Sequence, residues 1–141
     1  MVEEYETKVM PRRPWREEDG AKKVNAYRPK LWVGAPYLEE AAPQIRALVE
    51  GKAVVVHNLR FDWSYSYLVQ MVNMRMVPVC FDTKSIARAL LQGRLEIKTF
   101  SADEIAKALG LPEEPKPHTA INGARQALAM WRRMIASRNS C

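Results

Sequence analysis

The stretch that decides the fold is VVVHNLRFDWSYSYL, which runs from Val54 to Leu68. Its three valines follow Ala53, and such a continuous apolar run is typical of a strand buried on both faces of a parallel sheet. The run ends on His57 and Asn58, and Asp62 follows about one helical turn later. In open α/β sheets, ligands bind beyond the carboxyl ends of the strands. The stretch therefore predicts a strand, a polar crevice at its end, and a helix whose first turn brings an acid to that crevice.

Strands and helices alternate around this stretch. A second apolar run at 77–83 predicts another buried strand, with Asp82 or Thr83 capping the helix that follows as far as Gly93. The remaining patterns predict a strand at 5–11 and helices at 37–50 (regular from Pro43), 61–76, 102–109 and 119–138, with a short helix around 17–25. Strand–helix–strand alternation favours a parallel α/β arrangement with right-handed crossovers. We expect one domain over 1–141, with an irregular part at 1–36.

Length and composition limit the class of protein. A chain of 141 residues is long enough for one domain with a sizeable core. Its apolar runs are too short to span a bilayer, and its acidic, alternating N-terminus is unlike a signal peptide, so no membrane association is expected. Cys80 in a strand and Cys141 at the end make a structural disulfide unexpected, which favours a cytoplasmic location. The formal net charge of +6 suits an anionic partner such as nucleic acid, although charge alone does not identify one.

A second polar junction lies in PKPHTAINGARQAL, where His118 follows a proline-rich loop at the entry to the last helix. A histidine with a near-neutral pKa at such a junction is a candidate general base. Taken singly, a surface histidine and an ordinary turn asparagine are the commoner explanations. The chain has only two histidines, however, and both lie at junctions that flank the predicted crevice.

Four segments taken together resemble a known family. VVVHNLRFDWSYSYL, VPVCFDTKSIARALL, KALGLP and HTAINGARQAL are similar, in order and spacing, to the second and third motifs of the DnaQ-like 3′–5′ exonucleases, the DEDDh group of the ribonuclease-H-like fold. The resemblance extends from about Tyr37 to Trp131, and more loosely back to Tyr5. We therefore expect a family-like core at 37–135. It implies a three-layer α/β domain with a mixed sheet, and hydrolysis of phosphodiester bonds from the 3′ end of DNA or RNA.

The resemblance also implies roles for individual residues. Family members use Mg²⁺ or Mn²⁺, which carboxylates hold and which clamp the scissile phosphate and activate water. Asp62 would be a metal-binding carboxylate, and His118 the base that takes a proton from the attacking water. His57 and Asn58 would shape the crevice that receives a single-stranded 3′ end. Phe61 would hold the Asp62 backbone in place by packing in the core.

The sequence departs from the family pattern at two places. Gly123 stands five residues after His118, where the family has an aspartate. The Asp-x-Glu of the opening strand is missing, since VEEYETKVMP resembles a later strand, although Glu4 and Glu6 have the right spacing. Of the carboxylates that offset two dications in the family, Asp62 remains, and two such ions in an uncompensated site would repel strongly. The sequence therefore predicts that this chain alone is impaired or inactive as a nuclease.

Several interpretations stay open. Without the first strands, the strand at 53–58 would have an open edge, which invites pairing with another chain. Either a truncated reading frame or completion of the sheet by association would explain this. The chain is then a whole or shortened exonuclease, a non-catalytic module that binds nucleic acid or a polymerase partner, or a fragment of a decayed gene. A module could use the following basic and aromatic residues for phosphate contacts and base stacking: Arg132, Arg133, Arg138, Trp63, Tyr65 and Tyr67.

Overall fold

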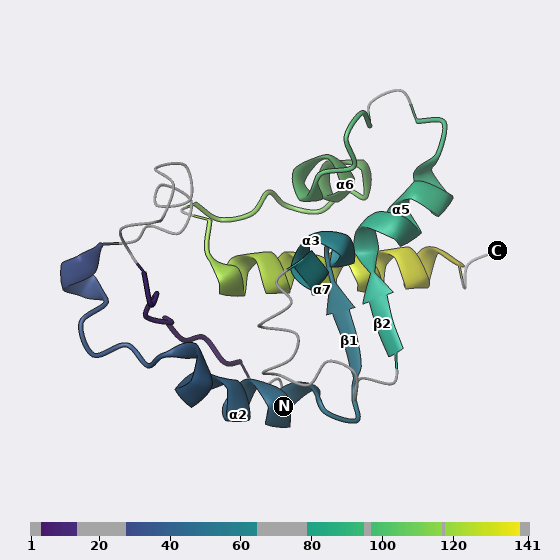
Figure 1. Ribbon diagram of the computed structural model, residues 1–141. Helices are drawn as coiled ribbons and strands as arrows, with labels where there is room; N and C mark the ends of the chain where they lie inside the picture. Colours follow the sequence, from purple (N-terminus) through teal and green to yellow (C-terminus); the bar gives the residue numbers. More distant parts are fainter. Residues whose placement is uncertain (1–3, 14–27, 65–78, 95–96, 117, 139–141) are drawn as a thin grey trace.

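Two short parallel strands organise the fold (Figure 1). The computed structural model describes residues 4–13, 28–64, 79–94, 97–116 and 118–138. Strand β1, Ala53–Val56, pairs with β2, Val79–Asp82, in a register that sets Val56 opposite Asp82. Both strands lie within the predicted apolar runs, and their parallel pairing confirms the predicted α/β class.

The strands are less buried than the sequence predicts. In each strand the first residue is exposed and the next three are half-buried. The prediction of burial on both faces is therefore wrong, because the sheet in the described part of the chain has only these two strands. The mixed, three-layer ribonuclease-H-like architecture stays a prediction.

Helix α2, Leu38–Val49, begins earlier than expected. The predicted regular start was Pro43, but the helix already begins at Leu38 and contains Pro43. The backbone N–H of Tyr37 donates to the Glu40 carboxylate over 2.7 Å, and this contact supports the first turn. Gly51, just beyond the end, has a φ of +68°, which is the left-handed conformation expected of a glycine at that place.

Helices α3, α5 and α6 are short, with six to nine residues each. Helix α3, Leu59–Ser64, leads out of β1, and the rest of the predicted helix lies outside the described residues. Helix α5, Thr83–Leu91, follows β2 directly, with Asp82 as its N-cap. Ser101 caps α6, Ala102–Ala108, through a 3.3 Å hydrogen bond from the Glu104 N–H, as the serine followed by acids predicts.

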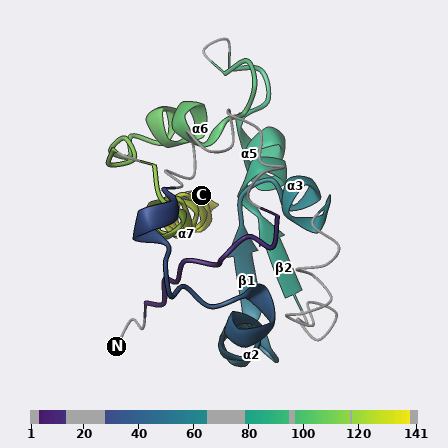
Figure 2. The same ribbon diagram turned by 60° about the vertical axis from the view of Figure 1, so that its left-hand side comes forward.

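Helix α7, Ala120–Arg138, is the longest element among the described residues and packs against β1, α5 and α6 (Figure 2). The core lies where α5, α6 and α7 meet, and its buried side chains are Ala87, Ile105, Ala106, Met130 and Met134. Trp131 extends this packing toward the sheet, since its ring lies 5.5 Å from that of Phe81. No helix in these segments is both long and apolar enough to cross a bilayer.

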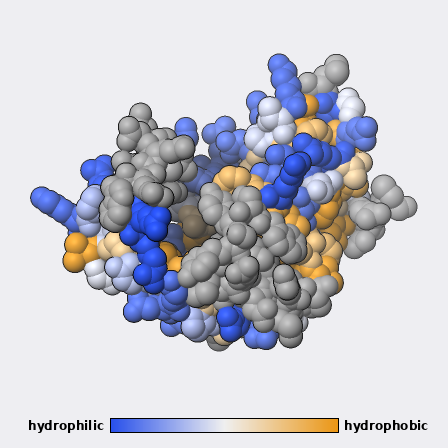
Figure 3. Space-filling view, in the orientation of Figure 1, coloured by the Kyte–Doolittle hydropathy of each residue, from blue (hydrophilic) through white to orange (hydrophobic). Residues whose placement is uncertain are grey.

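The N-terminal part is irregular where it is described. A short 3-10 helix, η2, spans Pro29–Leu31, and residues 4–13 form no strand. The predicted strand at 5–11 is therefore wrong: its Met10 N–H donates to Pro36 O over 2.8 Å, in the loop before α2, and not to a strand. The helix expected around 17–25 lies outside the described residues. Hydrophobic residues gather over β2 and α5 on the face in Figure 3.

Candidate functional site

A turn at the end of β1 is bound to the end of β2. The backbone N–H of Asn58 donates to Asp82 Oδ1 over 2.8 Å. Asn58 has a φ of +68°, a left-handed conformation that asparagine tolerates better than most other side chains. The turn leads straight into α3, so the predicted junction of strand, polar turn and helix is present.

Asp82 organises this end of the sheet. Its Oδ1 also accepts a 3.1 Å hydrogen bond from the Lys84 N–H, and its Oδ2 accepts one of 2.8 Å from the Ser85 hydroxyl. Partial burial disfavours the charged carboxylate, but the hydrogen bonds from Ser85, Asn58 and Lys84 outweigh it, so the pKa of Asp82 is lowered. Asp82 is therefore a structural carboxylate whose two oxygens are both engaged.

His57 is held by a second hydrogen-bonded chain. Its Nδ1 lies 2.9 Å from Thr83 Oγ1, and the Thr83 hydroxyl donates to Val56 O over 3.1 Å. A hydroxyl has one proton, so His57 Nδ1 must be the donor to Thr83, and in the neutral ring Nε2 is then an acceptor. Burial lowers the pKa of His57, an effect that Asp82 opposes and Lys84 reinforces. Burial therefore favours the neutral imidazole, and the hydrogen-bonded chain selects the tautomer with its proton on Nδ1.

Asp62 lies in the first turn of α3, as predicted, and is exposed. Desolvation of its carboxyl group, and then the charge of Asp82, raise its pKa. Burial, followed by the charges of Asp82 and Asp62, raises the pKa of the Cys80 thiol in β2. Asp62 and Asp82 therefore lie close enough at the end of the sheet to influence each other.

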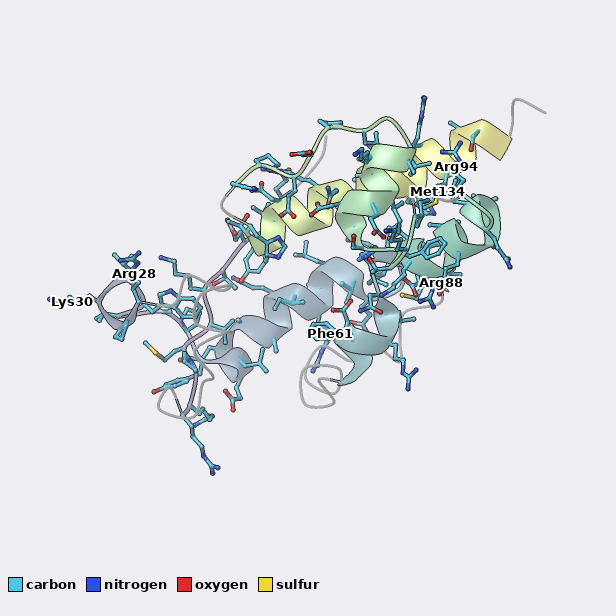
Figure 4. All side chains as sticks on the ribbon, turned by 90° about the horizontal axis from the view of Figure 1, so that it is seen from above. Arg28, Lys30, Phe61, Arg88, Arg94 and Met134 are labelled. Atoms are coloured by element: carbon cyan, nitrogen blue, oxygen red, sulfur yellow. The ribbon has the colours of Figure 1, made fainter. Side chains whose placement is uncertain are left out.

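Phe61 does not pack in the core. Its side chain is 57% exposed, and Figure 4 shows it well apart from Met134 of the core. The predicted packing role is wrong, because more than half of the Phe61 side chain is exposed to solvent. Its role as a substrate-binding residue stays a prediction.

His118 lies at the entry to α7, as predicted, and lines a hollow beside α6. Its side chain is 59% exposed, and Nδ1 lies 2.8 Å from Glu114 Oε1 and 2.9 Å from Oε2. The hollow has a volume of about 430 Å³ and is lined by Asp103, Glu104 and Lys107 of α6 as well as by the 113–116 loop and His118. The structure thus gathers His57, Asn58 and Asp62 at the end of the sheet, and His118 beside α6. A shared site stays a prediction.

Gly123 faces His118. A Cβ added at Gly123 would lie 3.6 Å from His118 Cε1, which is ordinary van der Waals contact. Position 123, where the resemblance implies an aspartate, is therefore directed at the histidine ring. The glycine leaves that place without a carboxylate.

The donor set does not fit a pair of divalent ions. Hard cations need several oxygen ligands, and both oxygens of Asp82 already accept hydrogen bonds. Across the segments given above, no cluster of three or more His, Cys, Asp and Glu side chains is placed to hold a metal ion. Asp62 alone would leave two dications largely uncompensated.

Other predicted contact residues divide into two groups. Arg132 and Arg133 are exposed on α7. The side chains of Trp63, Tyr65, Tyr67 and Arg138 lie outside the described residues.

Sequence reasoning missed two structural features. Asp82 was expected only as a possible helix cap; that it also receives the turn after β1 depends on the register that sets it opposite Val56, which the sequence does not specify. Gln126 was not considered, and it is a buried amide beside a small hollow. A glutamine on a long helix carries no signal of burial, because most glutamines are exposed.

Comparisons with known proteins give one distant relationship. No protein-family model matches the chain. Over 137 residues the chain is 22% identical to proteins named DNA polymerase III PolC-type from Thermotoga maritima and from Thermotoga petrophila. These alignments cover 96% of the chain and 10% of each relative, so the chain spans about a tenth of the length of the curated relatives it matches.

Proposed function

We propose that the chain is an exonuclease-like domain that binds single-stranded DNA and has little or no hydrolytic activity on its own. The observation that carries the proposal is the state of the carboxylates beyond β1 and β2. Asp62 is exposed there, whereas Asp82 is occupied by hydrogen bonds from three residues. This geometry suits a polar binding crevice better than a two-metal centre.

Two observations support nucleic acid as the ligand. The sequence resembles the DnaQ-like exonucleases, and its distant relatives are named as DNA polymerases, which favours DNA over RNA. Cationic side chains also lie on the elements around the end of the sheet. Arg60 is exposed in the same helix, α3, as Asp62, and the charge of Lys84 in α5 acts on His57. Such groups suit contacts with the phosphate backbone, which position a strand without reading its sequence.

We infer a ribonuclease-H-like domain in which His57, Asn58 and Phe61 contact the strand. Asp62 would hold at most a single, weakly bound and largely hydrated Mg²⁺ or Mn²⁺ ion. His118 would be the base of any residual hydrolysis.

A binding assay tests the proposal. Fluorescence anisotropy with a labelled single-stranded DNA should show saturable binding that weakens steeply as salt increases, because released counterions drive the association. The double variant Arg60→Ala/Lys84→Ala should bind several-fold more weakly. Arg28→Ala/Lys30→Ala removes the same charge at the far end of the molecule (Figure 4) and serves as the control. Binding that is absent, or insensitive to salt, would refute the proposal.

A nuclease assay tests whether the chain lacks hydrolytic activity on its own. With Mn²⁺ and a labelled strand, we expect no shortening above that of Asp62→Ala, with Glu50→Ala as a control for loss of an exposed acid. Metal-dependent trimming that Asp62→Ala abolishes and Glu50→Ala retains would establish an exonuclease instead.

Association with a polymerase is the second candidate. It is favoured by the name of the relatives, of which this chain matches about a tenth. Co-purification of the tagged chain with a replicative DNA polymerase from the same cells, resistant to nuclease treatment, would support it. Loss of the polymerase after nuclease treatment would assign the contact to DNA.

A further inference from the structure

A short turn at 28–34 lies at one end of the molecule. It contains η2, Pro29–Leu31, and Figure 4 shows its labelled residues Arg28 and Lys30 far from those of α3, α5 and the core. The side chains of Leu31 and Val33 are 62% and 81% exposed, the two highest values among the large hydrophobic residues that the structure describes. Single exposed apolar residues are common. Two of them within three positions give this turn an apolar tip.

Hydrogen bonds hold the backbone of the 28–34 turn. The N–H of Leu31 donates to Arg28 O over 2.8 Å. The N–H of Trp32 donates to Pro29 O over 3.2 Å. Lys8 Nζ donates to Leu31 O over 3.1 Å, which ties the turn to the N-terminal segment. Because the folded chain already holds this backbone, a partner would not have to order it, and the entropic cost of binding is lower.

The charges of the 28–34 turn are all positive. From Gly20 to Leu38 the sequence contains four lysines and arginines and no aspartate or glutamate. Arg28 and Lys30 are both exposed and directly precede the apolar tip. A partner surface that carries carboxylates beside apolar groups would therefore be complementary to this turn.

This combination selects the class of partner. A nucleic acid stacks its bases on aromatic rings, whereas the two most exposed side chains of the turn are aliphatic. A bilayer would gain too little from two aliphatic side chains for stable anchoring. A second copy of the chain would bring like charges together. A protein surface with an apolar pocket and acidic edges suits both the tip and its charges.

We propose that the 28–34 turn docks on a partner protein whose surface offers an apolar pocket edged by aspartate and glutamate side chains. Leu31 and Val33 enter the pocket, and Arg28 and Lys30 pair with the carboxylates at its edge. Apolar anchors in a desolvated centre with a polar rim are the usual anatomy of a protein interface. The docking goes beyond the proposed DNA binding, because the turn lies far from Phe61 of α3 (Figure 4).

Photo-crosslinking from the tip tests the docking. The full chain with Val33→p-benzoylphenylalanine, expressed in its own cells and irradiated, should form an adduct with a partner protein. Mass spectrometry should map the adduct to a segment that contains both apolar and acidic residues. The same photoreactive residue in place of Glu50, an exposed position at the end of α2, is the matched control and should give several-fold less of this adduct.

Second substitutions in the photoreactive chain test each half of the contact. Leu31→Ser should reduce the adduct by about fivefold or more, as should Arg28→Ala/Lys30→Ala. Arg28→Lys/Lys30→Arg keeps both charges and should retain the adduct. Circular dichroism would check that each variant is folded.

Every other outcome refutes the docking. No adduct, an equal adduct from positions 33 and 50, or a mapped segment without carboxylates would overturn it. An adduct with nucleic acid, lipid or a second copy of the chain would assign the turn to that partner instead.

The docking and the proposed function can fail separately. Arg28→Ala/Lys30→Ala should lose the adduct and keep the affinity for single-stranded DNA. Arg60→Ala/Lys84→Ala should keep the adduct and lose affinity for DNA. If the first double variant lost DNA binding as well, the turn would belong to the DNA interface and the docking would be refuted.

Discussion

The backbone N–H of Asn58 donates to the side chain of Asp82 over 2.8 Å, and this hydrogen bond fastens the end of one strand to the end of the next. The same carboxylate caps α5 through Lys84 and Ser85. One side chain therefore fixes the turn into α3 and the start of α5.

Asp82→Ala should destabilise the protein by about 1–3 kcal/mol, because it removes a helix cap and leaves the Asn58 N–H without its acceptor. Urea unfolding followed by circular dichroism would measure the loss. Asp103→Ala, which removes an exposed acid from the first turn of α6, should cost no more than about 0.5 kcal/mol. Equal losses in the two variants would contradict the central role of Asp82.

The contribution of Asp82 should depend on pH. The pKa of its carboxyl group is lowered in the folded state from an ordinary value of 3.8. The folded protein therefore binds this proton less readily than the unfolded chain, and the stabilisation is fully present above the unfolded pKa. It should be lost as the pH falls through the folded pKa. Melting curves from pH 7 down to acid should show the wild type and Asp82→Asn converging, and a constant gap would contradict this assignment.

Thr83→Val should release His57 from its single tautomer. The change leaves His57 Nδ1 and Val56 O without their shared partner, and should cost about 2 kcal/mol of stability in this fully buried position. Long-range ¹H–¹⁵N NMR spectra should show the Nδ1–H form in the wild type and a mixture in the variant. Thr83→Ser keeps the hydroxyl and should keep the Nδ1–H form. A wild-type ring protonated at Nε2 would refute the hydrogen-bonded chain.

His57 should also make folding sensitive to mild acid. Burial lowers its pKa from 6.5, so the unfolded chain binds this proton more readily than the folded protein does. The free energy of unfolding should therefore reach its full value above the unfolded pKa of His57. It should decrease as the pH is lowered through that pKa toward the folded pKa. His57→Gln should remove this dependence between about pH 7 and pH 5.

Gly123→Ala and Gly51→Ala should have opposite effects. Alanine is favoured over glycine inside a helix, and its Cβ at position 123 would only touch His118, so the first variant should gain about 1 kcal/mol. At Gly51 the φ of +68° forces a side chain into the left-handed region, at a cost of about 1 kcal/mol. Urea unfolding of both would check the pair, and a loss at position 123 would contradict the described fit.

Gln126→Met should stabilise the protein by about 1 kcal/mol, because it replaces an amide without partners by an apolar side chain of similar length. Gln92→Met at an exposed position should leave the stability within about 0.5 kcal/mol. A loss of stability in Gln126→Met would show that the amide is satisfied in solution.

Elements with strong local signals could be predicted from the sequence. The two apolar runs became parallel strands, and Ser101 and Gly51 mark a helix start and a helix end where expected. Elements that depend on a partner could not be predicted. The alternating segment at 5–11 has the composition of a strand but forms none in the described residues, because periodicity does not specify a neighbour.

The candidate site shows the same limit. Sequence position placed His57, Asn58 and Asp62 correctly around the end of β1, since they follow a strand within a few residues. The hydrogen bonds that fix His57 and Asn58 come from Thr83 and Asp82, about 25 residues away, and depend on the pairing register. The exposure of Phe61 could not be predicted from its position, because the apolar character of phenylalanine favours burial.

The contact between Glu4 and Arg125 spans nearly the whole chain and ends at the rim of the Gln126 hollow. A protease that removed the first few residues would take away the Glu4 carboxylate, and the Arg125 guanidinium would keep its 3.4 Å contact with Asn122 Oδ1. Cleavage near the N-terminus would thus raise the net positive charge at the rim of a distant hollow. N-terminal processing would then strengthen the attraction of that rim for a polyanion.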